Sequence, residues 1–179
     1  AMLCETNPQE VMDLSPVAHL ATIEGKVPFI NFFDGFRTSH EIQKIEKWDY
    51  ADLKEMCNMD AVEAFRAHAL NPEHPAMRGS HENGDVFFQH REACNTAYNE
   101  LPAIVEKYMA KINEKLGTNY DLFNYYGAED ADRVIVAMGS VNDVAEEVID
   151  YLTAKGEKVG LIKVRLYRPW VSSALLDVI

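Results

Sequence analysis

The last third of the sequence contains a strand–helix–strand pattern that leaves few choices of fold. A short apolar run, 133-RVIVAMG-139, is followed by Ser140, a residue type that favours helix N-termini. Gly156 then precedes a second apolar run, 159-VGLIKVRLY-167. This pattern predicts two neighbouring parallel strands joined by a right-handed crossover helix over residues 140–155, and hence an α/β fold. The helix should pack across both strands with its apolar residues, which recur every 3.6 positions: Val141, Val144, Ala145, Val148, Ile149 and Leu152.

A helix is also expected near the start of the sequence, over residues 8–24. It starts with Pro8, a residue suited to the first helical turn, and carries apolar side chains at helical spacing. Pro16 should bend this helix, and Gly25 should end it in the manner of a glycine just past a helix C-terminus.

Further helices are expected in the middle of the chain. Two short ones are predicted over residues 49–56 and 60–70. The helical pattern returns over residues 87–116, where Pro102 either kinks one long helix or begins a second one, and Gly117 should end it. Its expected buried face consists of Ile104, Val105, Tyr108, Met109, Ile112 and Leu116.

A strand followed by a polar loop is expected over residues 27–33, because unbroken apolar runs are typical of strands buried on both faces. Thr38 and Glu41 have the spacing of a capping box, which predicts a helical turn after Thr38. Ligand loops in open α/β sheets lie past the carboxyl ends of strands. Asp34, Arg37 and Thr38 therefore either line a binding site or form a structural strand-to-helix corner.

Turn residues dominate residues 71–85, which include Asn71-Pro72 and Asn83-Gly84. Little apolar surface is available there to hold the segment against a core. The segment is therefore expected to be an exposed and mobile boundary.

Composition and charge narrow the class of protein. The chain has 47% hydrophobic residues, which is typical of a globular protein. Its 29 acidic residues outnumber 17 basic ones, so a nucleic-acid or anionic-membrane surface is disfavoured. No apolar run approaches the ~20 residues of a membrane span, and the first ten residues, AMLCETNPQE, lack a signal-peptide layout. A cytoplasmic location is therefore expected.

The cysteines and histidines do not predict a metal site. Cys4, Cys57 and Cys94 are far apart, which suits reduced thiols better than a cluster or zinc framework. His90 and Cys94 could place two ligands on one face of a helix. Zinc takes four ligands, however, and no other residue is spaced to join them.

Gly139-Ser140 follows a strand and precedes a helix, where free backbone N–H groups can bind a phosphate. The sequence has neither G-x-G-x-x-G nor G-K-[ST] at this position. A capped structural corner is therefore the preferred interpretation over a nucleotide site.

Several long segments of the sequence are similar to segments of a known protein family. They are 10-EVMDLSPVAHLATIEGKVPFINFFDGFRTSHEIQKIE-46, 71-NPEHPAMRG-79, 87-FFQHREA-93, 123-FNYYGAEDADRVIVAMGSV-141 and 156-GEKVGLIKVRLYRP-169. With them the sequence resembles pyruvate:ferredoxin (or flavodoxin) oxidoreductase, a family of anaerobic thiamine-diphosphate enzymes. The resemblance covers roughly residues 7–170, and residues 171–179 are not expected to share it.

Members of that family are far longer, so the resemblance implies an internal fragment with an α/β fold. The end of the pyrimidine-binding, thiamine-diphosphate-binding domain would occupy residues 1–48. A helical connecting region with the loop at 71–85 would occupy residues 49–120. An incomplete three-layer α/β domain, similar to the C-terminal domain of transketolase, would occupy residues 121–179.

The resemblance also implies a function for the full-length enzyme: oxidative decarboxylation of pyruvate to acetyl-CoA and CO₂, with electrons passed to ferredoxin or flavodoxin. Such an enzyme uses thiamine diphosphate, magnesium, 4Fe-4S clusters and coenzyme A, and is expected to be a homodimer. Its cofactor-binding residues belong to segments outside this chain. No catalytic, cofactor-binding or metal-binding residue is therefore assigned here, and the chain alone is expected to bind no cofactor and to be inactive.

Two alternatives belong to other functional classes. The chain could be a non-catalytic scaffold or interface module, which is compatible with a catalytic parent enzyme. It could also be an independent binder of a small ligand at Gly139-Ser140.

Overall fold

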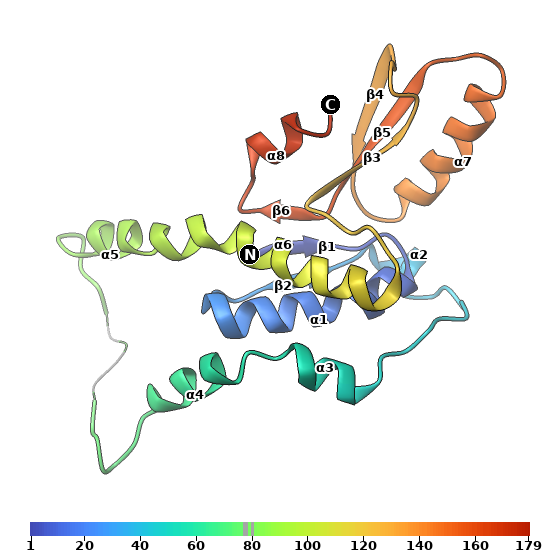
Figure 1. The fold of residues 1–179 in the computed structure, drawn as a ribbon. Coiled ribbons are helices and arrows are strands. Elements are labelled where there is room, and N and C mark those ends of the chain that lie inside the picture. Colours follow the sequence, from blue (N-terminus) through green and yellow to red (C-terminus); the bar gives the residue numbers. More distant parts are fainter. Residues whose placement is uncertain (77–78, 80) are drawn as a thin grey trace.

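A computed structural model describes residues 1–76, 79 and 81–179 (Figure 1). The strands are β1 Met2–Cys4, β2 Ile30–Phe32, β3 Phe123–Gly127, β4 Arg133–Ala137, β5 Val159–Val164 and β6 Leu166–Arg168. The helices are α1 Pro8–Gly25, α2 Gly35–Thr38, α3 Tyr50–Met56, α4 Met59–Ala67, α5 Phe87–Ala93, α6 Asn95–Leu116, α7 Val141–Thr153 and α8 Ser172–Leu176. The α/β fold class predicted from the sequence is confirmed.

The predicted strand–helix–strand unit is present in the sheet with strand order β3-β5-β4. β4 and β5 pair in parallel, with Arg133 opposite Val159 and Ala137 opposite Lys163. β3 pairs with the other side of β5 in the antiparallel direction. Figure 1 shows α7 lying beside this sheet as the connection between its two parallel strands. The parallel pairing and the crossover helix are therefore confirmed.

The second apolar run does not form one strand as expected. β5 ends at Val164, Arg165 follows it, and β6 then joins a different sheet with strand order β2-β1-β6. The backbone of Arg165 explains the division, because its N–H donates to Leu122 while its carbonyl accepts from Cys4. Arg165 thus connects the two sheets.

The strand predicted over residues 27–33 is shorter and more exposed than expected. β2 contains only Ile30–Phe32 and pairs with β1 alone, so it is an edge strand. Ile30 is largely exposed. The expectation of burial on both faces is therefore wrong, because Ile30 lies on a face that is open to solvent. The edge position leaves one side of the strand backbone without a neighbouring strand as well.

The core lies where α1 packs against α6. Pro8 occupies the first turn of α1, and the side chain of Asn7 caps that turn by accepting from the Glu10 N–H. The buried side chains of this interface include Leu14, Val17, Ala21, Leu101, Val105, Tyr108, Met109 and Ile112. The helix over residues 8–24 and most of the predicted α6 face are confirmed, whereas Leu116 is partly exposed and Leu101 was not predicted.

Gly25 has a different role from the one predicted. It is the last residue of α1, and Lys26 beyond it adopts the left-handed conformation with φ of 55°. A Cβ atom on Gly25 would lie 2.8 Å from Leu101 Cδ1. Gly25 therefore permits the close approach of α1 and α6 rather than supplying the left-handed cap.

The alternative that a second helix begins at Pro102 is wrong. The break between helices falls at Cys94, between α5 and α6, and α6 continues through Pro102. Leu101 and Val105, on either side of the proline, are completely buried. We attribute the continuity to this packing, which outweighs the one hydrogen bond that a proline removes. Gly117 ends α6 in the left-handed conformation, as predicted.

The predicted capping box does not form. Thr38 is the last residue of α2 instead of the first cap of a helix, and residues 39–49 contain no helix. Ile42 in this segment is fully exposed, so no apolar stripe packs there to support a helix. The two short helices expected next are present as α3 and α4, capped by the side chains of Asp49 and Asn58.

The predicted packing of α7 is only partly correct. Ile149 is 3% exposed, but Val148 is 48% exposed, and Val141 and Val144 are similarly accessible. β4 is the edge strand of its sheet, and its residues Val134–Val136 are exposed as well. The helix covers the sheet with its Ile149 side, so the expectation that Val148 is buried is wrong.

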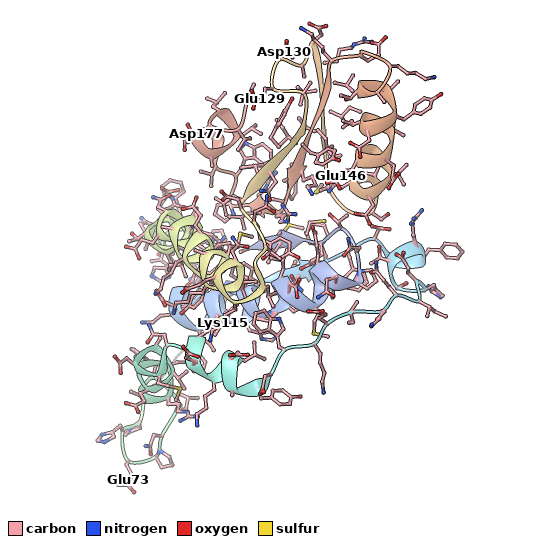
Figure 2. All side chains as sticks on the ribbon, turned by 45° about the vertical axis from the view of Figure 1, so that its right-hand side comes forward. Glu73, Lys115, Glu129, Asp130, Glu146 and Asp177 are labelled. Carbon is pink, nitrogen blue, oxygen red and sulfur yellow. The ribbon has the colours of Figure 1, made fainter. Side chains whose placement is uncertain are left out.

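The loop predicted over residues 71–85 is exposed wherever it is described. It contains an isolated bridge between Asn71 and His74, and Figure 2 shows Glu73 at its far tip. Met77, Arg78 and Ser80 lie outside the described residues. None of the described helices combines the length and hydrophobicity that a bilayer crossing requires.

We expect limited proteolysis of the native chain to cut first within residues 71–85, because exposed backbone with little apolar contact opens at low free-energy cost. A broad-specificity protease at low concentration, followed by mass spectrometry of the early fragments, measures the order of cleavage. The β4–α7–β5 unit is the internal control, because β5 is buried between its neighbours. Earlier cleavage within residues 133–164 than within the loop would contradict the prediction.

Candidate functional site

The carboxyl ends of β2 and β4 lead into two loops that meet. Asp34, two residues after β2, accepts hydrogen bonds from the backbone N–H and from the hydroxyl of Ser140, both at 2.7 Å. Partial burial alone would raise the pKa of Asp34, but these bonds from Ser140 outweigh it and hold the pKa below its ordinary value. Asp34 is therefore a carboxylate that binds the start of α7.

The contact between Asp34 and Ser140 disfavours the phosphate site considered at Gly139-Ser140. The N–H of Ser140, which a phosphate would need, is already bonded to Asp34. Gly139 has φ of 81°, and a Cβ there would lie 3.2 Å from Asp34 Oδ1. The geometry therefore supports a structural corner, in which glycine is required by both its conformation and the nearby carboxylate.

Of the other two polar residues of this loop, Thr38 lies beside Asp34 and helps to lower the pKa of its carboxyl, whereas no described contact joins Arg37 to Asp34. Arg37 is exposed to solvent, whereas Thr38 is buried. His40 N–H bonds to the Arg37 carbonyl, which closes the turn. The loop thus presents one exposed cation next to a carboxylate that is already engaged.

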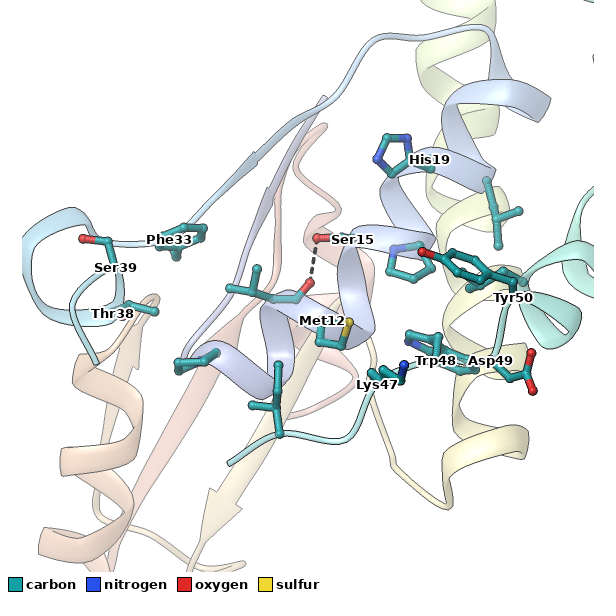
Figure 3. Close-up of a pocket in the computed structure, with 16 residues that line it drawn as sticks. Met12, Ser15, His19, Phe33, Thr38, Ser39, Lys47, Trp48, Asp49 and Tyr50 are labelled. Carbon is teal, nitrogen blue, oxygen red and sulfur yellow. Dashed lines mark hydrogen bonds between the residues drawn. The ribbon is translucent and has the colours of Figure 1, made fainter. Parts of the chain in front are cut away.

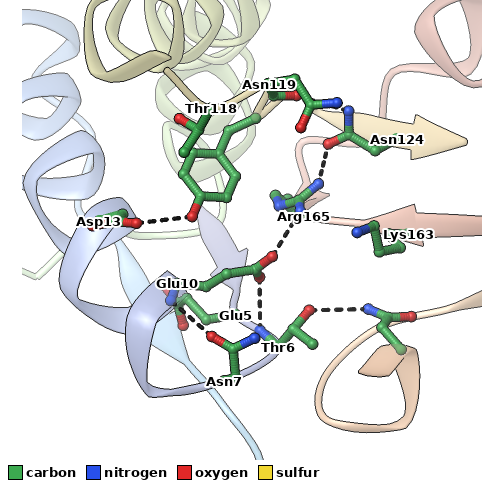
Figure 4. Close-up of polar contacts among 12 residues, drawn as sticks. Glu5, Thr6, Asn7, Glu10, Asp13, Thr118, Asn119, Asn124, Lys163 and Arg165 are labelled. Carbon is green, nitrogen blue, oxygen red and sulfur yellow. Dashed lines mark hydrogen bonds and ion pairs between the residues drawn. The ribbon is translucent and has the colours of Figure 1, made fainter. Parts of the chain in front are cut away.

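A buried ion pair joins α1 to the connection between β5 and β6 (Figure 4). Arg165 Nη2 lies 2.7 Å from Glu10 Oε1, and the two side chains are only 4% and 10% exposed. The other oxygen of Glu10 accepts from Thr6 N–H at 2.9 Å. The guanidinium of Arg165 also donates to Asn124 and lies over the Tyr120 ring, 5.1 Å from its centroid.

More polar contacts extend from this ion pair towards α7 and the end of α6. We call the buried region around them the junction. Asn142 donates to the Thr6 hydroxyl at 3.2 Å. Tyr120 donates to Asp13 at 2.8 Å. Burial raises the pKa of Asp13, although the hydrogen bond from Tyr120 opposes this. The N-terminal half of α1, the first turn of α7, β3 and the connection after β5 thus share one largely buried polar network.

Glu5 lies beside this network without joining it (Figure 4). Its side chain is 0% exposed, and its carboxyl oxygens bond to no member of that network. The polar side chain beside the carboxyl group is Asn31, whose own carbonyl oxygen lacks a donor among the described residues. Burial, and then the neighbouring charge of Glu10, raise the pKa of Glu5 to about 9. Glu5 is therefore protonated at neutral pH in the folded chain.

An apolar groove of about 1100 Å³ runs along the other side of α1 (Figure 3). Met12 and His19 on α1 face Trp48 and Tyr50 across it. The hydroxyl of Ser15 donates to the Val11 carbonyl at 2.6 Å, so no neighbouring base activates it as a nucleophile. The lining residues suit packing against an apolar surface better than chemistry.

The cysteines and histidines are dispersed in the structure as well. His90 bonds to Glu82 at 2.6 Å, and the Cys94 thiol donates to the His90 carbonyl at 3.3 Å. Cys4 is buried and Cys57 partly buried, each on a separate element. Within residues 1–76, 79 and 81–179, no three His, Cys, Asp or Glu side chains gather as a metal site.

Comparison with known families gives two matches in order along the chain. Residues 1–110 match the family model "Pyruvate flavodoxin/ferredoxin oxidoreductase, thiamine diP-bdg". Residues 131–179 match "Pyruvate:ferredoxin oxidoreductase core domain II". The second match extends to residue 179, so the expectation that the resemblance stops near residue 170 is wrong.

Curated relatives agree with these matches. The pyruvate-flavodoxin oxidoreductase of Enterobacter agglomerans is 59% identical over 170 residues, which are 95% of this chain and 14% of that protein. The pyruvate:ferredoxin oxidoreductase of Moorella thermoacetica is 54% identical over 179 residues, 100% of this chain and 15% of that protein. The pyruvate dehydrogenase [NADP(+)] of Cryptosporidium parvum is 50% identical over 169 residues, 94% of this chain and 9% of that protein. The chain thus spans about one seventh or less of these relatives.

Proposed function

Because this chain belongs to the pyruvate flavodoxin/ferredoxin oxidoreductase family, we propose that it is one portion of an enzyme that oxidatively decarboxylates pyruvate to acetyl-CoA and CO₂ and passes the electrons to ferredoxin or flavodoxin. The observation that carries the proposal is the succession of two different domain models from one enzyme family along 179 residues. High identity to relatives about seven times longer supports it. The complete enzyme would be a cytoplasmic homodimer.

Within that enzyme, this portion serves as a non-catalytic scaffold. We divide it into the end of a pyrimidine-binding domain at residues 1–48, a helical connection at 49–120 and part of a transketolase-like domain at 121–179. The Glu10–Arg165 pair and the Asp34–Ser140 contact support this role, because each joins the first of these regions to the third. Their function is to hold the two domains in a fixed relation.

The described residues do not fit the cofactors of such an enzyme. Thiamine diphosphate, when bound, supplies the carbanion sink for decarboxylation. The best-placed helix N-terminus for its pyrophosphate, that of α7, is bonded to Asp34. Cys4, Cys57 and Cys94 lie on separate elements, whereas a 4Fe-4S cluster takes four cysteine thiolates. The sites for thiamine diphosphate with magnesium, for the clusters and for coenzyme A are therefore proposed to lie in other parts of the enzyme, and Asp34, Arg37 and Thr38 act as interface residues.

A chimera tests the family function directly. The aligned segment of the Moorella thermoacetica enzyme is replaced by this chain, which that enzyme matches over its full 179 residues. We expect the purified chimera to retain pyruvate-dependent reduction of a low-potential dye. A soluble chimera with its cofactors bound but no activity would contradict the proposed function.

The chain alone is expected to be inactive in the same assay, even with thiamine diphosphate, magnesium and coenzyme A supplied. Holding cofactor and substrate in register contributes ~7–11 kcal/mol in favourable cases, and this portion lacks a cofactor cradle among its described residues. Calorimetric titration with thiamine diphosphate should show no binding, with the intact Moorella enzyme as the positive control. Turnover above the no-protein background would overturn the scaffold role and direct attention to Asp34, Arg37 and Thr38.

A further inference from the structure

The scaffold role does not explain why the side chain of Glu5, an acidic residue, is completely buried at the junction. Glu5 follows β1, the central strand of its sheet. Its own N–H donates to the Phe32 carbonyl at 3.0 Å, while the N–H of Cys4 donates to the Arg165 carbonyl at 2.9 Å. The backbone that carries Glu5 is therefore bonded on both sides, and its carboxyl group is buried from water in this arrangement.

The charges around Glu5 make its ionisation unfavourable. Arg165, the cation of this network, is already paired with Glu10 at 2.7 Å. The charged and titratable groups that surround the junction are Glu10 and Asp13 on α1, Cys4 on β1, Arg165 between the two sheets, Asp34 after β2 and Asp143 on α7. Most of them are acidic, so an ionised Glu5 would add another buried carboxylate to Glu10 and Asp13 against a single guanidinium.

We propose that Glu5 is a proton-linked lock on the end of β1, which keeps β1 bonded to Phe32 and Arg165 while Glu5 is protonated and favours their separation once it is ionised. An ionised Glu5 regains hydration only if the end of β1 separates from Phe32 or Arg165. The proton leaves to solvent in this step, and no other group changes. The lock is a property of this chain and does not depend on the proposed enzymatic function.

The sign of the pH dependence follows from the raised pKa. Below the ordinary pKa of a glutamate, the folded and unfolded chains both hold the proton, and the full stability is present. Above it, the unfolded chain releases the proton while the folded chain retains it, so stability falls as pH rises until the folded pKa of about 9 is reached.

Glu5→Gln tests the lock, because glutamine has nearly the same shape and cannot ionise. Urea unfolding is measured at about pH 6 and about pH 9. We expect the folding equilibrium constant of the natural sequence to fall by at least about tenfold more over this range than that of Glu5→Gln. Glu73→Gln, at an exposed loop position, is the matched control and should behave like the natural sequence.

Infrared spectroscopy gives a second readout that does not require the variant to fold. The natural chain at neutral pH should show the carbonyl band of a protonated carboxylic acid, and this band should disappear as pH rises past about 9. A folded Glu5→Gln chain should lack the band. Parallel pH dependence of the two chains, or absence of the band from the natural chain at neutral pH, would overturn the proposal.

Discussion

Replacing Arg165 with Met lowers the free energy of unfolding by about 3–5 kcal/mol, because removal of one partner leaves a buried charge without compensation. Glu10 would lose its partner at 2.7 Å while its side chain remains 90% covered. Met retains most of the apolar volume of the arginine stem, so the loss reports the charge and its hydrogen bonds more than a cavity. Urea unfolding followed by circular dichroism measures the change.

The chain supplies a matched control for this variant. Arg133 pairs with Glu157 at 3.1 Å, but its side chain is 74% exposed. Arg133→Met should therefore change the stability by only about 0–1 kcal/mol. Adding Glu10→Gln to Arg165→Met should recover part of the loss, because the second change removes the orphaned charge. Equal effects of the two arginine variants would show that the Glu10–Arg165 pair is not buried as described.

Replacing Ile149 with Asp should cost several kcal/mol, since it places a carboxylate between α7 and the β3-β5-β4 sheet. Ile149 is 3% exposed, and its Cγ2 lies within 3.2 Å of the position of a Cβ on Gly127. Val148→Asp, one position earlier on the helix, is the control. Because Val148 is 48% exposed, its substitution should cost about 1 kcal/mol or less.

Thermal and urea unfolding of both variants measure the difference. Adjacent positions share the same helix, so the change in helix propensity is nearly common to both, and burial alone separates them. A Val148→Asp chain that unfolds as easily as Ile149→Asp would show that the helix presents its other side to the sheet.

Local periodicity was sufficient to predict the long helices and the parallel strand pair. The apolar repeat in α6, the residues that end the helices, and the two runs around α7 are all readable within short windows of sequence. Exposure was harder to predict. The apolar stripe of α7 contains Ile149 and Val148 alike, and only the position of β4 at the edge of the sheet distinguishes the buried from the exposed one.

The contacts that join the two ends of the chain at the candidate site could not be predicted, because Asp34–Ser140 and Glu10–Arg165 each join residues more than 100 positions apart. Nothing near Asp34 in the sequence indicates that its carboxylate binds Ser140. The one available signal for the ion pair was Arg165, a charged residue inside an apolar run, which demands a buried partner. β1 escaped prediction for a related reason. It has only three residues and is defined by its neighbours β2 and β6 rather than by a pattern of its own.

The pairing of β1 with β6 has a consequence for biosynthesis. A ribosome releases Met2–Cys4 among the first residues of this stretch and Leu166–Arg168 among the last, yet these segments are partners in one sheet. One edge of β1 therefore has no partner strand until the residues between β1 and β6 have been translated. During that interval β1 can pair with β2 and α1 can pack on α6, but the second edge of β1 stays open. Closure of so large a loop slows the final step. An exposed strand edge in a partly synthesised chain is also where chaperones bind and where aggregation begins.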